Sequence, residues 1–148
     1  MDGIYKTKKV WECILDNLKK NQKINGFEDA YFSTIYTIKL AETIDISIKK
    51  KITGRYNCGS SDSCSKYEFA VKIAECFGLD KSLITPISID DFNFKAKRGK
   101  NLILNVSKLK SALSHNPPTI SESIAAFYRD FNKGLYKNIR KEAIPNPT

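Results

Sequence analysis

The first apolar residues of the chain recur at helical spacing and predict a helix over residues 7–20. They are Val10, Trp11, Ile14, Leu15 and Leu18. Lysines follow at the end of this segment, where they suit a helix C-terminus. The short apolar run from Ile24 to Phe27 predicts a strand, and residues 28–34 are expected to form a loop.

Residues 36–50 carry two overlapping patterns. Ile38, Ala41, Ile44 and Ile48 fit one face of a helix, whereas Ile44, Ile46 and Ile48 also alternate as in a strand. The length of the segment favours the helix. Gly54 follows a basic run and is a candidate end of that helix, and residues 55–58 then predict a short buried strand.

Two later helices have clear start signals. Ser65 with Glu68, and Thr119 with Glu122, each form a capping-box pair. Gly78 lies where the first of these helices should end in a left-handed residue. Apolar residues at helical spacing follow each start signal. They are Phe69, Ile73, Cys76 and Phe77 in the first helix, and Ile124, Phe127, Tyr128 and Phe131 in the second.

Between these helices the pattern is weaker. Residues 83–89, interrupted by Pro86, predict an edge strand, because proline cannot donate to a central ladder. Residues 101–104 are expected to be extended, and Ser107 to cap a brief helix that ends at Leu113. We expect one domain over residues 1–135 and a frayed tail over residues 136–148.

The composition is that of a globular protein with an excess of positive charge. Of 148 residues, 41% are hydrophobic and 28% charged, and the net charge is +9. No apolar run reaches the roughly 18 residues of a membrane span, and no signal peptide opens the chain, so a cytoplasmic location is expected. Only four basic residues are arginines, which favours a lysine-rich solvated surface over a nucleic-acid-binding one.

The cysteines and the single histidine do not have the spacing of a zinc site. Cys13 and Cys76 fall on apolar helix faces and are expected to be buried thiols. Cys58 and Cys64 flank a Gly/Ser loop. A disulfide between them is compatible with the sequence, but the expected cytoplasmic location argues against it.

A series of short motifs runs through most of the chain, over about residues 8–133. In order they are K-I-x-x-F-x-D from Lys23, Y-x-x-x-L-A from Tyr36, G-x-Y from Gly54, S-x-Y-E-F-A from Ser65, K-R-x-K from Lys97 and S-K-L from Ser107. In this order and spacing they resemble the C-terminal, substrate-binding half of dTDP-4-dehydrorhamnose reductases and related sugar-nucleotide reductases of the extended short-chain dehydrogenase class.

The resemblance implies an α/β fold: a truncated extended short-chain dehydrogenase, made of the C-terminal substrate domain plus the last helix and strand of the Rossmann sheet (residues 36–50 and 55–58). In that family a Rossmann domain holds NAD(P) on a glycine-rich loop, and a Tyr-x-x-x-Lys pair serves the reduction of a 4-keto sugar nucleotide. These 148 residues contain no glycine-rich fingerprint, so no cofactor is expected to bind this chain alone. Tyr5 and Lys9 have the spacing of the pair but lie too close to Trp11 for the intervening strand, and no catalytic residue is assigned.

The resemblance also suggests substrate contacts, each with a structural alternative. Arg98 either clamps a nucleotide pyrophosphate or is a solvated loop charge. Tyr31 and Phe32, with Ser33 beside them, either flank a base or sugar or pack against the first helix. Trp11 either lines the pocket or belongs to the core.

The substrate loops depart from the family pattern, in which D-Q-x-x-x-P-T-Y precedes x-x-D-L-A. Here Ala30, Thr34, Ile35 and Lys39 replace the Gln, Pro, Thr and second Asp. Gly99 follows Arg98 in place of Pro, and Asn105 stands in place of the Asp before S-K-L.

Three functions follow from these observations. The first is the substrate-binding part of a sugar-nucleotide reductase, which would take a sugar nucleotide and work with a separate Rossmann half or a second copy of itself. The second is a non-catalytic regulatory or binding subunit, which the altered loops fit. The third, a basic nucleic-acid-binding module, is the least favoured.

Overall fold

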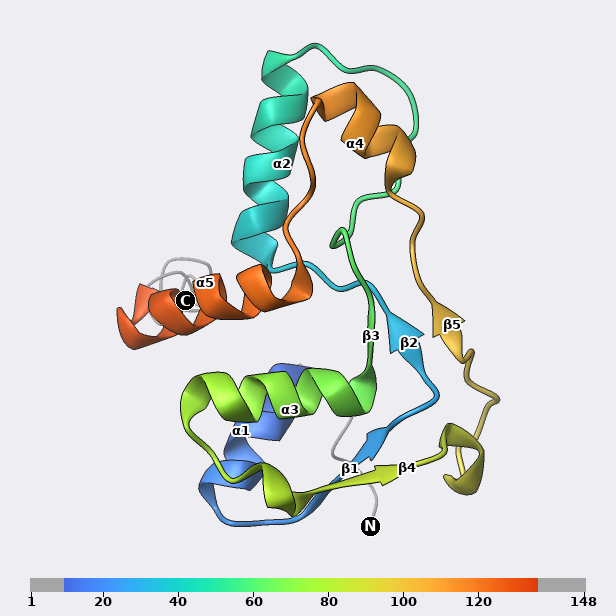
Figure 1. The fold of residues 1–148 in the computed structure, drawn as a ribbon, viewed down its shortest axis with the longest axis vertical. Helices are drawn as coiled ribbons and strands as arrows, with labels where there is room; N and C mark the ends of the chain where they lie inside the picture. The colour runs from blue at the N-terminus through green and yellow to red at the C-terminus, as the bar shows by residue number, and fades with distance from the viewer. Residues whose placement is uncertain (1–9, 136–148) are drawn as a thin grey trace, which may run out of the picture.

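The computed structural model describes residues 10–135. The strands are short and form no broad sheet (Figure 1). The helices are α1 (Val10–Lys19), α2 (Thr37–Lys49), α3 (Lys66–Phe77), α4 (Ser107–Leu113) and α5 (Ile120–Asn132). The strands are β1 (Ile24–Phe27), β2 (Tyr31–Phe32), β3 (Cys64–Ser65), β4 (Ile84–Ile87) and β5 (Asn101–Leu102), with two 3-10 turns at η1 (Lys81–Leu83) and η2 (Ile89–Asp91).

The strands form two small sheets. In one, β1 and β4 run parallel, with Ile24 opposite Ile84. In the other, β2 lies in the middle, antiparallel to β3 and parallel to β5. Pro86 lies in β4, which has a neighbour on one side only, as the edge-strand prediction requires. The predicted loop over residues 28–34 was therefore wrong in part, because β3 and β5 flank Tyr31 and Phe32 and make them a central strand.

The main core lies where α1, α3 and α5 meet (Figure 1). Leu18, Ile73 and Ile120 are almost fully buried there, at 2%, 1% and 0% exposure. The aromatic rings of α5 close one side of this core, and the Trp11 ring lies 4.5 Å from that of Phe127, centroid to centroid. The amphipathic patterns predicted for α1, α3 and α5 are confirmed by these contacts.

Helix α3 begins and ends at the predicted signals. The Ser65 hydroxyl accepts a hydrogen bond from the Glu68 amide, and the Glu68 carboxylate accepts one from the Ser65 amide. Gly78 adopts φ 63° at the C-terminus, a left-handed conformation that favours glycine. Thr119 and Glu122 form the same reciprocal pair at the start of α5, so both capping boxes are confirmed.

Strand β1 approaches α3 more closely than most residues would allow. A Cβ atom added at Gly26 would lie 2.7 Å from the Tyr67 Cα atom, which is backbone and cannot move aside. Glycine is thus required at this position of the K-I-x-x-F-x-D segment by packing.

The segment after α2 differs from the prediction. The helix ends at Lys49, and Lys51 rather than Gly54 takes the left-handed conformation that follows it, with φ 53°. Residues 55–58 form no strand, since no strand of the described chain lies beside them, and Arg55 and Asn57 are exposed. Lys108 holds this segment instead, because its ammonium group donates to the Arg55 carbonyl.

Two smaller expectations also need correction. Val106, not Ser107, is the N-cap of α4, and the Asn105 side chain accepts a hydrogen bond from the Ser107 amide. Cys13 and Cys76 are only half-buried. Cys64 is the buried thiol, and burial raises its pKa to about 11. None of the four cysteines, all among the described residues, is in a disulfide. The expected tail over residues 136–148, and Tyr5 and Lys9, lie outside the described residues.

No helix among residues 10–135 is long and apolar enough to cross a membrane.

The capping box of α3 gives a direct stability test. We expect Ser65→Ala to lower the free energy of unfolding by about 1 kcal/mol, because the Glu68 amide loses its acceptor. Urea denaturation would measure this. Ser63→Ala is the matched control, since Ser63 is exposed two residues earlier. Equal stability of the two variants would show that the cap contributes nothing.

Candidate functional site

The predicted substrate residues Tyr31, Phe32 and Ser33 lie on and just after β2, in the middle of the three-stranded sheet. Tyr31 is 42% exposed, and its amide donates to the Lys100 carbonyl at 2.7 Å. That bond brings the end of the basic loop, residues 92–100, beside Tyr31. Tyr31 is thus the member of this group with an exposed ring.

Phe32 and Ser33 have structural contacts. The Phe32 ring packs edge-on against Phe69 of α3 at 5.2 Å, rather than against α1. Ser33 is buried, and its hydroxyl accepts from the Leu104 amide at 2.9 Å. Its carbonyl lies 2.7 Å from where a Cβ atom of Gly59 would be, so the two segments touch at backbone distance. Ser33 therefore joins β2 to the chain after β5.

Arg98 lies on the basic loop. Its guanidinium carbon is 5.4 Å from the centre of the Phe94 ring, a cation–π distance. The side chain is exposed and makes no ion pair with any residue from 10 to 135. It is consequently available to an anion.

Trp11 lies elsewhere. Its ring packs on Phe127 and stands edge-on to Phe131 at 6.4 Å, within the α1–α5 contact. The structure therefore brings Tyr31 and Arg98 to one region through the β2–β5 pairing and places Trp11 in the core.

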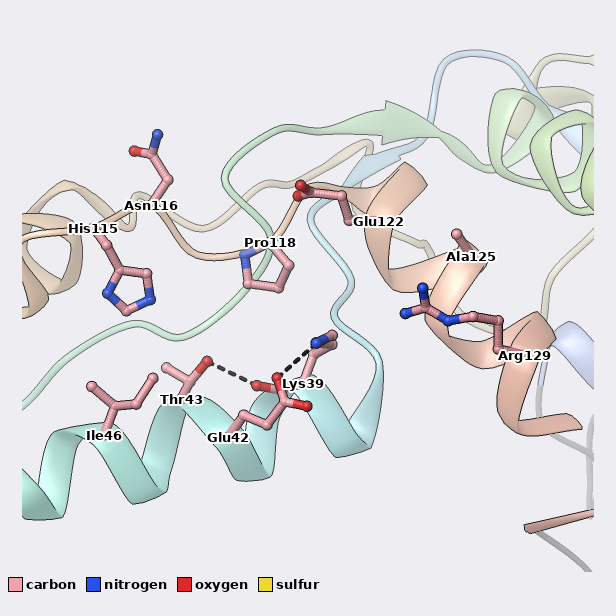
Figure 2. A pocket seen from close by; sticks show the side chains of 10 residues that line it. All are labelled: Lys39, Glu42, Thr43, Ile46, His115, Asn116, Pro118, Glu122, Ala125 and Arg129. Atoms are coloured by element: carbon pink, nitrogen blue, oxygen red, sulfur yellow. Dashed lines mark hydrogen bonds and ion pairs between the residues drawn. The ribbon is translucent and has the colours of Figure 1, made fainter. Parts of the chain in front are cut away.

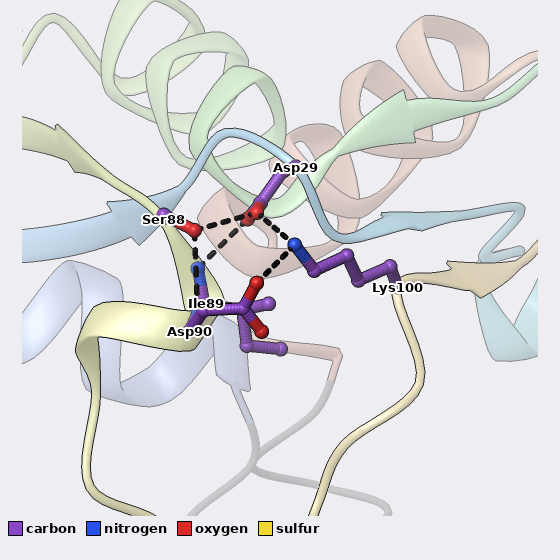
Figure 3. Close-up of polar contacts among 5 residues, drawn as sticks. All are labelled: Asp29, Ser88, Ile89, Asp90 and Lys100. Carbon is purple, nitrogen blue, oxygen red and sulfur yellow. Dashed lines mark hydrogen bonds and ion pairs between the residues drawn. The ribbon is translucent and has the colours of Figure 1, made fainter.

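The basic loop is tied to the body of the protein by Asp29 (Figure 3). The Asp29 carboxylate accepts from the Ser88 hydroxyl at 2.7 Å and from the Ile89 amide at 2.8 Å, and it pairs with Lys100 at 2.9 Å. Lys100 also bridges to Asp90. These bonds, the one from Ile89 first, hold the pKa of Asp29 well below its ordinary value. The network joins the β1–β2 turn, η2 and the end of the loop at one point.

A separate cavity of about 450 Å³ lies between α2, the α4–α5 loop and α5 (Figure 2). It contains none of the predicted site residues. Its lining consists of Lys39, Glu42, Thr43, Ile46, His115, Asn116, Pro118, Glu122, Ala125 and Arg129.

Most charges of this cavity are already paired. Lys39, which stands where the family pattern has Asp, pairs with Glu42 at 2.7 Å. Glu122 caps α5 through Thr119, and that hydrogen bonding lowers its pKa. No pairing of a nucleophile with a base joins these ten residues. The charged groups that line the cavity thus mostly have partners already, as expected for a solvent-filled gap between two helices.

Tyr36 connects the same two helices. Burial, together with the Asp130 carboxylate, raises its pKa to about 12. The phenol therefore stays protonated at neutral pH and serves packing, against the Phe127 ring at 5.7 Å.

Comparison with known proteins identifies the relationship. The family model described as the RmlD substrate-binding domain matches residues 4–133. The chain belongs to this family. Comparison with curated proteins gives no match.

The RmlD substrate-binding fold is also seen in solved structures. A dTDP-4-dehydrorhamnose reductase from Bacillus anthracis, in complex with NADP, is 24% identical with a TM-score of 0.73, over 85% of this chain and 44% of that one. One from Clostridium acetobutylicum is 23% identical with a TM-score of 0.74, over 86% and 45%. A dTDP-glucose 4,6-dehydratase from B. anthracis, in complex with NAD, is 16% identical with a TM-score of 0.64, over 91% and 43%. The chain spans somewhat less than half the length of these structures.

Sequence reasoning missed three features of this RmlD-family chain. The roles of Lys100 and Asp29 depend on contacts across some 70 residues, which no local pattern encodes. The cavity needs α2 and α5 to face one another. Lys66 occupies a variable position of the S-x-Y-E-F-A motif, yet its ammonium group lies over the Phe27 ring, which packs on Phe92 and Phe94 of the basic loop.

The Asp29 network predicts a pH dependence. Because the folded-state pKa of Asp29 is depressed, its contribution to stability is present above the unfolded value, about pH 4, and is lost as pH falls through the folded value. We expect Asp29→Asn to be less stable at pH 7 and to lose less stability than the wild type between pH 5 and pH 2. Thermal melts across this range would measure both. Asp91→Asn is the control, and parallel curves for all three proteins would contradict the assignment.

Proposed function

We propose that this domain is the substrate-binding part of a sugar-nucleotide reductase of the dTDP-4-dehydrorhamnose reductase type. The observation that carries the proposal is the junction of β2 and β5, which brings Tyr31 and the Arg98 loop together within an RmlD substrate-binding fold. An exposed phenol ring next to a loop that carries a guanidinium without an ion pair among the described residues suits a ligand that combines a ring with a diphosphate.

The chemistry of hydride transfer would come from another part of the enzyme. Relatives of this fold have been solved with NADP and NAD, but residues 1–148 contain no glycine-rich loop to hold either. We propose that a Rossmann half, on this polypeptide or on another, supplies the cofactor and the Tyr-x-x-x-Lys pair. The role of this domain is then to bind and orient the keto sugar nucleotide.

The exposed face of α2 supports a protein partner. Ile44 and Ile48 lie one turn apart and are 50% and 70% exposed, whereas Thr43 is the only buried residue of the described helix. Apolar residues at this spacing normally face a core. We propose that the Rossmann half covers this face in the assembled enzyme, and that a second copy does so when the domain is alone.

A ligand titration tests the substrate proposal. We expect dTDP-sugars or UDP-sugars, but not NADPH, to raise the thermal midpoint of the domain in a concentration-dependent way, because a ligand of the native state stabilises it. Arg98→Ala should reduce the shift. Lys97→Ala, one residue away on the same exposed loop, should not.

The alternative function is a non-catalytic regulatory or binding subunit. It is favoured by the Ser33 hydroxyl, which is already bonded to Leu104, and by Ile35, which offers no hydroxyl in place of the family's Thr. No midpoint shift with any of these nucleotides would favour this alternative over the reductase part.

Self-association through the exposed apolar face of α2 can be tested in the isolated domain. Light scattering over a range of concentrations should show association, since the apolar face has no cover. Ile44→Lys with Ile48→Lys should give a monomer with an unchanged thermal midpoint. Val10→Lys, which alters an apolar side chain 52% exposed on α1, should still associate. A wild-type monomer at every concentration would contradict self-association.

A further inference from the structure

Three phenylalanine rings form an aromatic cluster beside the basic loop. Phe27 ends β1, and Phe92 and Phe94 follow η2. The Phe27 ring lies 5.7 Å from that of Phe92 and 5.6 Å from that of Phe94, and the last two rings are 4.6 Å apart. Phe92 is 38% exposed, so one side of the cluster faces solvent.

Two cations rest on this cluster from different parts of the chain. Arg98 lies over the Phe94 ring, and the Lys66 ammonium group lies 5.9 Å from the centre of the Phe27 ring. Lys66 is the first residue of α3, and its amide donates to the Ala30 carbonyl at 3.0 Å. This bond fixes Lys66 next to Tyr31.

Neither cation is neutralised by a carboxylate of the described chain. Three acidic groups from the surrounding segments have other partners: Asp29 and Asp90 are both paired with Lys100, and Glu68 closes the capping box of α3. No ion pair of Lys66 or Arg98 occurs among residues 10–135. Two positive charges are left together on an aromatic surface.

Lys66 is also partly withdrawn from water. Burial, followed by repulsion from Arg98, lowers the pKa of Lys66. Both causes disfavour the charged amine in the free protein. An anion bound between Lys66 and Arg98 would relieve both, because it supplies the missing opposite charge.

We infer that Lys66 is a second phosphate-binding cation beside Arg98, and that the two side chains together hold the diphosphate of the ligand. The aromatic cluster fixes both stems, and Tyr31 lies at the edge of the same site. The inference names the ligand's diphosphate and so rests on the proposed function, but the anion site itself is tested without any sugar.

Isothermal titration of the domain with inorganic pyrophosphate and with dTDP tests the inference. We expect both to bind, with an affinity that falls as salt is raised. Lys66→Ala and Arg98→Ala should each weaken binding of both about tenfold, since each removes a charged donor. Lys66→Arg should keep most of the affinity. Lys97→Ala should bind like the wild type, and thermal midpoints would verify that every variant is folded.

The outcomes separate the inference from the function on which it rests. Wild-type affinity in Lys66→Ala, with a loss in Arg98→Ala, overturns the role of Lys66 and leaves the substrate proposal standing. Binding of pyrophosphate that depends on Lys66, but no gain in affinity for any sugar nucleotide over pyrophosphate, supports the anion site and counts against the reductase function. No binding of pyrophosphate or dTDP by the wild type overturns the inference.

Discussion

The contact between β1 and α3 determines how the substrate side of this domain is built. At Gly26 the strand approaches the backbone of Tyr67 so closely that a methyl group would not fit. This approach lets β1 lie along α3 while the other side of α3 packs on α1 and α5. The β1–β2 turn then emerges at the N-terminus of α3, where the Lys66 amide holds Ala30. A displaced helix would move the turn, and with it Asp29 and Tyr31.

Asp29 connects the β1–β2 turn, which is held at the N-terminus of α3, to the basic loop. One carboxylate receives a hydroxyl, an amide and an ammonium group, each from a segment far from it in sequence. Lys100 in turn pairs with both Asp29 and Asp90, so the end of the basic loop is held next to its beginning. Because the Lys100 side chain is half exposed, each of its two ion pairs adds modestly to stability, and their main effect is to restrict where the loop can lie.

The helices could be predicted from the sequence, because their signals are local. A capping box places its own donor and acceptor within four residues, and Gly78 marks the end of α3 by its own backbone preference. The strands have no local sequence signal of this kind. Tyr31 and Phe32 form β2 only because β3 and β5 lie beside them, and residues 55–58 remain irregular because no neighbour does. The same reasoning separates the site residues: Tyr31 was proposed as a ligand contact from its place in the motif series, whereas the placing of Lys66 and Arg98 on one aromatic cluster depends on how two distant segments fold.

Charge placement links the altered loops to the proposed anion site. The substitution at Lys39 introduces a cation where the family has an acid, but Glu42 neutralises it within the same helix. Lys100 likewise occupies the two acids closest to it. Among the described residues the ion pairs engage Lys39, Lys49, Lys81 and Lys100, and most other cations, Lys66 and Arg98 included, have no carboxylate partner. What distinguishes Lys66 and Arg98 is that both lie over rings of one aromatic cluster. Two like charges brought close, one of them half-buried, cost stability in the free domain, as the lowered pKa of Lys66 indicates, and an anion bound between them would offset that cost.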